Sequence, residues 1–181
     1  MYPGSRPGKS TKDDAEAFAE LYEYYLPKVF RYISYRVNDM YLVEDLTSEV
    51  FEKALTKLDS YRSNKASFST WLLSIAHNTV IDHYRAKSRK VTISIEETFE
   101  LASGEASPEK ELVRKEELHR LDTCLGGLSQ QEQEIISLKF GAELSNRQIG
   151  KMLSLSESNV GTKLYRVIRK LRDSFMEGQN G

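Results

Sequence analysis

Residues 144–172, LSNRQIGKMLSLSESNVGTKLYRVIRKLR, carry the sharpest local pattern in the chain. Ser145 and Gln148 have the spacing of a capping box, in which two side chains satisfy free amides at the start of a helix. Leu144 and Ile149 flank this pair at the positions of a hydrophobic staple. The pattern predicts that a helix begins at Ser145 and packs against a second helix.

The first helix is expected to end in a tight turn over 153–155, and Ser156 is expected to cap the second helix. Leu155 and Val160 form another staple pair around this cap. Ser154 occupies a turn position where glycine often adopts a left-handed conformation, which serine tolerates less well. The expected buried stripe of the second helix is Val160, Leu164, Val167, Ile168 and Leu171.

Two helices joined by a tight turn form a helix-turn-helix, whose second helix docks in the major groove of DNA. Gly150 in the first helix leaves room for the two helices to touch. The other face of the second helix is basic and carries amide and hydroxyl groups. Arginine can read guanine edges and asparagine adenine edges, while hydroxyls and lysine suit phosphates. The pattern therefore favours duplex DNA as a ligand.

The net charge of −1 conceals strong charge segregation along the chain. Residues 61–90 hold six lysines and arginines and one acidic residue, and residues 145–172 hold seven and one. Residues 13–60 hold five basic and eleven acidic residues. Two basic blocks in an otherwise acidic chain indicate contacts with nucleic acid at two separate places.

The rest of the chain is predicted to be helical, because apolar residues recur at spacings of three and four and no strand-like alternation appears. Helices are expected over about 13–36, 41–58 and 67–87. Pro27 is expected to bend the first of them or to mark a local break. The expected inward residues are Phe18, Leu21, Tyr22, Tyr25, Val29, Ile33 and Val37, then Val43, Leu46, Val50, Phe51, Ala54, Leu55 and Leu58, then Phe68, Trp71, Leu72, Ile75 and Ala76.

The expected fold class is all-α, with two small helical domains joined by a linker and the helix-turn-helix in the second domain. A helix capped by Ser107 is expected to run to about Leu125, and the capping-box pair Ser129 and Glu132 starts another. The boundaries predicted are a flexible tail over 1–12, a first domain over 13–90, a linker over 91–110 and a second domain over 111–177. The polar tail lacks the apolar centre of a signal peptide, and no apolar run approaches the roughly 20 residues of a membrane span. A cytoplasmic protein is therefore expected.

Enzyme chemistry finds no support in the sequence. Cys124 is the only cysteine, so no internal disulfide or cysteine-rich zinc site can form, and we expect it to be a small buried residue. His77, Asp82 and His83 lie close in sequence, but histidines six apart do not share a helix face as metal-binding pairs do. No glycine-rich phosphate loop or nucleophile elbow is present. We expect no catalytic residue, metal, cofactor or small-molecule substrate.

Three blocks of the chain resemble one known family. VEDLTSEVFEKA at 43–54 is similar to the AEDLxQExFxKA segment of the extracytoplasmic-function (ECF) RNA polymerase sigma factors. FSTWL, IAHN and IDHYR, between residues 68 and 85, resemble the segment that follows. LSQQE at 128–132 and the helix-turn-helix resemble the C-terminal domain of the family. The blocks stand in the family's order, and the resemblance covers about residues 13–175.

The resemblance implies an alternative sigma factor that binds core RNA polymerase and directs promoter-specific initiation by recognising and helping to melt promoter DNA. It implies that Asp45, Glu49 and Lys53 contact core polymerase. It assigns the minus-ten element to Asn64, Lys65, Ser67, Phe68, Asn78, Arg85, Lys87, Arg89 and Lys90. It assigns the minus-thirty-five element to Ser156, Asn159, Thr162, Lys163, Tyr165, Arg166 and Arg169.

Two further expectations follow from the same resemblance. An anti-sigma factor is an expected partner, beside core RNA polymerase and promoter DNA. Gly161 lies where the family usually has lysine or arginine, so readout of the upstream element is expected to differ from the family norm. The alternative interpretation is an autonomous helix-turn-helix regulator, in which residues 13–90 would sense a signal or dimerise.

Overall fold

The computed structural model describes residues 11–89, 120–121 and 123–177; the predicted linker over 91–110 and most of the predicted tail lie outside these ranges. The elements are α1 (Thr11–Ser34), α2 (Met40–Thr56), the 3-10 turn η1 (Leu58–Ser60), α3 (Phe68–Arg89), α5 (Gln130–Ile136), the π-helical turn η2 (Ser137–Gly141), α6 (Asn146–Leu153) and α7 (Glu157–Glu177). All regular structure in the described ranges is helical, which confirms the predicted fold class. None of the helices described has the length and apolar character that crossing a bilayer requires.

The first unit, residues 11–89, is built from α1, α2 and α3 around one apolar core. Asp39 and Ser67 act as N-caps, since Oδ1 of Asp39 accepts the Leu42 amide and Oγ of Ser67 accepts the Thr70 amide, both at 3.3 Å. Its buried apolar residues include Val29, Ile33, Val37, Val43, Leu46, Val50, Phe51, Ala54, Leu72, Leu73, Ile75, Ala76 and Val80. Each fully buried aliphatic side chain contributes about 1.5–3 kcal/mol, so the predicted stripes hold this unit together.

Expectations about burial are wrong at Tyr22, Leu55, Ile168 and Cys124. Tyr22 is 39% exposed, Leu55 57% and Ile168 41%, although all three were assigned to apolar stripes. At Leu55 and Ile168 the preceding residue, Ala54 or Val167, takes the inward position, because successive residues of a helix point about 100° apart. Cys124 is only half-buried.

Helix α1 continues through Pro27, so the local break expected there is absent. Pro27 lies on an exposed part of the helix. Proline removes one amide donor from a helix, and the carbonyl left without that donor can bond water when it faces solvent. The core contacts of α1 on both sides of Pro27 therefore belong to one element.

The second unit, residues 120–121 and 123–177, contains both predicted capping boxes. The Glu132 carboxylate accepts the Ser129 amide at 2.8 Å, and the Ser129 hydroxyl accepts the Glu132 amide. Gln148 Oε1 accepts the Ser145 amide at 2.9 Å, and the Ser145 hydroxyl accepts the Gln148 amide. These pairs satisfy amides that the first helical turn leaves free, and they begin α5 and α6 where the sequence predicts.

The helix-turn-helix of α6 and α7 is also confirmed. Ser154 adopts the left-handed conformation expected at the turn, with φ 56° and ψ 40°. A Cβ on Gly150 would lie 2.6 Å from the carbonyl oxygen of Leu155, so α6 and the turn that leads into α7 approach to a distance that only glycine allows. Val160 is fully buried between them.

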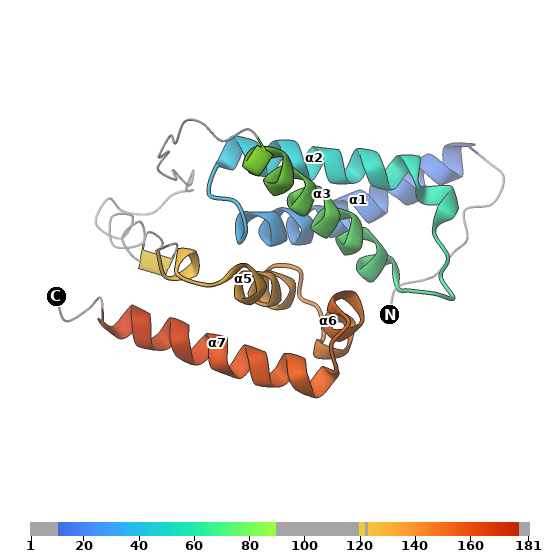
Figure 1. Cartoon of the computed structure of the whole chain (residues 1–181). Helices are drawn as coiled ribbons and strands as arrows, with labels where there is room; N and C mark the ends of the chain where they lie inside the picture. The colour runs from blue at the N-terminus through green and yellow to red at the C-terminus, as the bar shows by residue number, and fades with distance from the viewer. Residues whose placement is uncertain (1–10, 90–119, 122, 178–181) are drawn as a thin grey trace, which may run out of the picture.

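The two units pack directly against each other. Figure 1 shows α5 and α6 lying between the first unit and α7. Helix α1 contacts η2 and α3 contacts α6, and buried residues of both units belong to one continuous apolar cluster. Tyr32 of α1 and Arg36, in the turn directly after α1, lie off the predicted stripe, yet they are 0% and 5% exposed. Helix α1 therefore has a second buried face, which the second unit covers.

Candidate nucleic-acid interface

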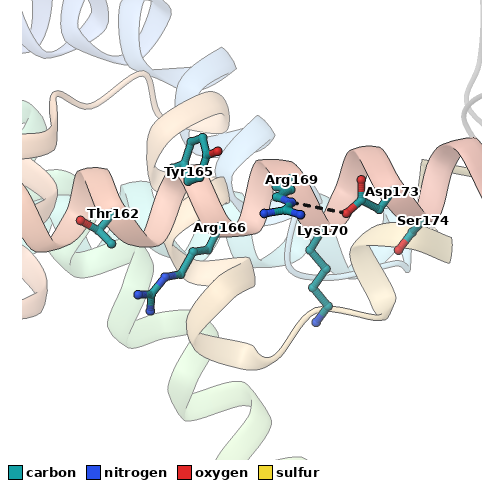
Figure 2. A pocket seen from close by; sticks show the side chains of 7 residues that line it. All are labelled: Thr162, Tyr165, Arg166, Arg169, Lys170, Asp173 and Ser174. Atoms are coloured by element: carbon teal, nitrogen blue, oxygen red, sulfur yellow. Dashed lines mark ion pairs between the residues drawn. The ribbon is translucent and has the colours of Figure 1, made fainter.

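Helix α7 presents a basic surface along one open hollow. The hollow has a volume of about 700 Å³ and is lined by Thr162, Tyr165, Arg166, Arg169, Lys170, Asp173 and Ser174. Figure 2 shows Arg166 and Lys170 projecting to one side of α7 and Tyr165 to the other. Tyr165 is 69% exposed, and Arg166 is exposed as well. An exposed arginine and an aromatic ring on a helix of this kind suit the edges of bases in a major groove.

Several of the residues predicted to contact the upstream element already have partners within the chain. The Ser156 hydroxyl accepts the Asn159 amide at 3.1 Å and so caps α7. The Thr162 hydroxyl donates to the Ser158 carbonyl at 3.1 Å. Lys163 Nζ donates to Gln131 Oε1 at 3.1 Å. Ser156 and Lys163 therefore help to position α7 and Thr162 bonds within it, whereas Tyr165 and Arg166 extend into solvent.

Arg169 and Lys170 differ in how their charges are balanced. Arg169 is 72% exposed and lies 3.9 Å from the Asp173 carboxylate, a contact weakened by solvent. Lys170 was not predicted as a site residue, although it stands one turn after Arg166. Its Nζ donates to the Gly127 carbonyl at 3.1 Å and pairs with Glu132 at 3.2 Å. Lys170 therefore ties α7 to the start of α5.

Two further basic residues escaped the sequence prediction. Arg147 and Lys151 are exposed on α6, four residues apart and hence on one helix face. In a helix-turn-helix the first helix crosses the DNA backbone, so these side chains are placed to contact phosphates. Their spacing within the basic block 145–172 is the signal that could have identified them.

Gly161 lies in the second turn of α7, inside the helix, without a structural need for glycine. A Cβ there would meet only the side-chain amide of Asn146, at 3.6 Å, which is an ordinary contact. We expect Gly161→Ala to raise the free energy of unfolding by about 0.5–1 kcal/mol, because glycine in a helix interior is less stable than alanine by that amount. Urea denaturation followed by circular dichroism measures the change.

Gly150→Ala is the matched contrast for that measurement. Its Cβ would collide with the Leu155 carbonyl oxygen, and forced packing of this kind costs about 1–3 kcal/mol. The two variants should change the free energy of unfolding in opposite directions, with Gly161→Ala raising it and Gly150→Ala lowering it. A destabilised Gly161→Ala protein would contradict the helical environment assigned to that position.

The segment before α3 holds the exposed residues predicted for the minus-ten element. Asn64, Lys65 and Ser67 are exposed, with Ser67 also capping α3. Phe68 is half-buried, and its ring centre lies 5.2 Å from that of Tyr25 and 5.3 Å from that of Trp71. An aromatic cluster therefore stands directly behind the exposed loop. Trp71 packs against the core, as expected.

The rest of the predicted minus-ten residues follow along α3. Asn78 and Arg85 are exposed and seven residues apart, which places them on one face of the helix. Asp82 lies between them and pairs with Arg85 at 3.7 Å. Lys87 is exposed and lines a cavity of about 560 Å³ near the α1–α2 connection. Lys90 and the side chain of Arg89 lie outside the described residues.

Helix α2 carries the acidic face predicted to contact polymerase. Asp45 is exposed, and the Glu49 carboxylate lies 2.5 Å from Lys53 Nζ. Lys53 also donates to the Thr79 hydroxyl at 3.1 Å, which holds it against α3. Glu52, exposed and one turn beyond Glu49, extends the same face. The surface open to a partner is thus acidic, and Lys53 contributes to it mainly by fixing Glu49.

A buried polar cluster between the two units was not predicted. Glu134 Oε1 accepts the Tyr32 hydroxyl at 2.9 Å and lies 2.9 Å from His77 Nδ1, while Oε2 forms an ion pair with Arg36. Burial raises the pKa of Tyr32, so its hydroxyl stays a donor. Burial and then the Arg36 charge lower the pKa of His77, so a neutral imidazole donates from Nδ1. His77 therefore serves this contact, a role that spacing within α3 could not reveal.

Sequence comparison finds two family models on this chain. Sigma-70 region 2 matches residues 21–90, and Sigma-70, region 4 matches residues 118–171. The RNA polymerase sigma factor YlaC of Bacillus subtilis is 31% identical, over 91% of this chain and 95% of its own length. The ECF RNA polymerase sigma factor BldN of Streptomyces coelicolor is 32% identical over 87% of this chain, which spans only 60% of BldN.

A solved structure shares the arrangement of helices. The sigma factor RpoE of Bartonella quintana, determined in complex with the anti-sigma factor NepR, matches with a TM-score of 0.71. The match covers 89% of this chain and 98% of that one, at 18% identity. At this identity the likeness establishes a common fold for the two chains.

Proposed function

Because the chain belongs to the ECF RNA polymerase sigma factors, we propose that it binds core RNA polymerase and directs it to promoters whose two elements its two units read. The observation that carries this proposal is the placement of the two exposed basic helices. Helix α3 falls within the match to Sigma-70 region 2, and α7 falls within the match to region 4.

The chemistry of the three surfaces supports a division of labour. The acidic face of α2, with Asp45 and Glu49, suits a basic helical surface of the polymerase. The exposed loop before α3 offers hydrogen-bonding groups beside an aromatic cluster, as a base taken out of the duplex requires. Asn78 adds a further exposed hydrogen-bonding group along α3. Arg166 on α7 suits a base edge in duplex DNA. The first surface contacts polymerase, the second acts at the minus-ten element and the third acts at the minus-thirty-five element.

Two DNA-binding units that each bind weakly gain affinity when both are bound to the promoter at the same time. We assign the first DNA-binding unit to residues 13–90, the second to residues 111–177 and the linker between them to residues 91–110. A linked pair binds through effective concentration, provided that the connection spans the two sites. Polymerase sets that span, so the free chain is expected to bind duplex promoters weakly and the complete holoenzyme tightly.

The proposed function also implies a regulatory partner and a place of action in the cell. RpoE is bound by an anti-sigma factor in its solved complex, and we propose that an anti-sigma factor also controls this chain. A subunit that acts on polymerase works in the cytoplasm and has no catalytic residues of its own. Its contribution to initiation is binding energy directed at promoter DNA.

A run-off transcription assay tests the proposed function. Core polymerase from a related bacterium is mixed with a library of genomic promoter fragments, with and without the purified chain. Transcripts with defined start sites are expected only when the chain is present. Thymines near these start sites should become reactive to permanganate, because melting exposes them.

Two results would contradict the proposal. Transcript patterns that do not change when the chain is added would remove the sigma factor assignment. Tight, sequence-specific binding to duplex DNA without polymerase would instead favour the autonomous regulator. Both results can be read from the same fragments, so the assay separates the two interpretations.

A further inference from the structure

The loop that leads into α3 is held in one conformation by hydrogen bonds within itself. It spans residues 61–67 and follows the short turn η1. The Lys65 amide donates to the Arg62 carbonyl at 3.0 Å, which closes a turn of four residues. At the far end, the Ser67 hydroxyl accepts the Thr70 amide and so begins α3. A loop that is already ordered in this way loses less freedom when it binds a ligand.

Tyr61 connects the beginning of this loop to its end. Its hydroxyl donates to the Ala66 carbonyl at 3.1 Å, five residues further along the chain. Its ring lies edge-on to that of Phe68, with the ring centres 5.5 Å apart, and its ring centre is 5.3 Å from that of Trp71. Burial raises the pKa of Tyr61, so the hydroxyl keeps its proton and remains a donor at neutral pH. The side chain of Tyr61 therefore bridges the two ends of the loop and is anchored in the aromatic cluster.

Arg62 uses its charged group on the backbone of the same segment. Its Nη1 donates to the Asp59 carbonyl at 2.5 Å and to the Tyr61 carbonyl at 3.0 Å. A charged donor forms a stronger hydrogen bond than a neutral one. An exposed arginine in a basic segment suggests a phosphate contact, but this guanidinium is engaged within the chain. Arg62 therefore stabilises the backbone that enters the loop.

Asn64 and Lys65, at the tip of the loop, are left to contact DNA. Both are exposed, and within the part of the chain that the structure describes their side chains form no hydrogen bond or ion pair. Taking a base out of the duplex costs free energy. Ordering the backbone of a loop at the same moment would add a cost in conformational entropy. A loop that Tyr61 and Arg62 order in advance avoids this second cost.

We propose that Tyr61 and Arg62 are positioning residues for promoter melting, which hold the loop over 61–67 in the conformation in which Asn64 and Lys65 meet an unstacked base of the minus-ten element. The inference rests on the proposed function, since it names the residues that order the DNA-binding loop of that function. Neither positioning side chain has to touch the base. Removing the Tyr61 hydroxyl weakens binding to the unstacked strand and leaves the binding of polymerase and of upstream duplex DNA unchanged.

Tyr61→Phe tests the inference, with Tyr24→Phe as the matched control. Each change keeps the ring and removes one hydroxyl that takes part in a hydrogen bond; that of Tyr24 accepts from Lys28 on α1. The free full-length proteins are digested briefly with trypsin, and mass spectrometry follows cleavage after Lys65. Cleavage is expected to be faster by about threefold or more in Tyr61→Phe only, because the loop opens more often when one of its hydrogen bonds is lost.

Binding of the holoenzyme to a single-stranded oligonucleotide is the second measurement. The oligonucleotide carries the minus-ten sequence of a promoter found in the run-off assay, and fluorescence anisotropy gives its affinity. Tyr61→Phe is expected to lower this affinity by about three- to tenfold, the range that one hydrogen bond covers. Affinities for core polymerase and for an upstream duplex should stay within about twofold of wild type. Arg62→Lys, which keeps the charge but removes the planar guanidinium, should also weaken single-strand binding.

The two measurements fail separately. Equal trypsin cleavage of wild type and Tyr61→Phe would overturn the role of Tyr61 in ordering the loop, whatever the DNA result. Faster cleavage with unchanged single-strand affinity would overturn the connection between loop order and base contact. Equal losses of single-strand, duplex and polymerase binding would indicate general damage to the first unit and overturn the positioning role. Absence of single-strand binding by the wild-type holoenzyme would overturn the proposed function, while the digestion still decides whether Tyr61 orders the loop.

Discussion

Replacing both Asp45 and Glu49 with arginine is expected to lower the affinity for core polymerase by about 100-fold or more. Both carboxylates are on the exposed acidic face of α2, which we propose docks on a basic surface of the polymerase. Placing like charges opposite each other at an interface costs several kcal/mol, and each 1.4 kcal/mol is a factor of ten in affinity. Run-off transcription should fall in parallel, because the chain acts only through polymerase.

The matched control reverses two charges elsewhere on the first unit. Glu20 and Glu23 are exposed on α1, so Glu20→Arg with Glu23→Arg changes the net charge by the same amount. This control is expected to retain affinity within about threefold, since exposed charges away from an interface act mainly through screened long-range forces. Equal losses in both double variants would indicate a general charge effect and would remove α2 as the docking face.

Arg166→Ala is expected to lower transcription from promoters that depend on the upstream element by about tenfold. Arg166 is exposed in the hollow along α7, and a bidentate contact between arginine and guanine contributes roughly 1–3 kcal/mol of discrimination. The preference at one base position should relax as well. If Arg166 instead contacts a phosphate, binding should weaken evenly across sequences and the salt dependence should decrease by about one ion.

Arg172→Ala is the control for this second experiment. Arg172 is exposed on the same helix but does not line the hollow. Its replacement removes an identical charge and is expected to leave transcription and base preference nearly unchanged. Run-off assays on a set of promoters with single substitutions in the upstream element measure both variants. Identical profiles for the two variants would show that the hollow on α7 does not read sequence.

Local patterns in the sequence predicted the individual elements well, because short-range chemistry decides them. A capping box needs only Ser145 and Gln148 at the correct spacing, and the structure forms it as predicted. The left-handed turn at Ser154 and the close approach at Gly150 follow from the same short segment. Apolar stripes were less reliable at their edges, where Leu55 is exposed because one residue along a helix changes the direction of a side chain.

The candidate surfaces were predicted in outline, and the structure changed the roles of several residues. Sequence spacing cannot reveal that Lys53 donates to Thr79 on a different helix, or that Lys163 donates to Gln131. These bonds depend on how helices distant in sequence lie together. Lys170 was missed for the same reason, since its partners at Gly127 and Glu132 become neighbours only when α7 packs beside α5.

An all-helical chain with two basic segments, an acidic helix and a helix-turn-helix could be predicted from the sequence, because helix caps, apolar spacing and charge are local properties. The packing of the two units against each other depends on contacts between helices far apart in the chain. In the sequence, Tyr32, Arg36 and Glu134 belong to no predicted apolar stripe or binding site. They form a buried cluster because the end of α1 packs against α5. Long-range packing creates that environment, and no pattern within one helix records it.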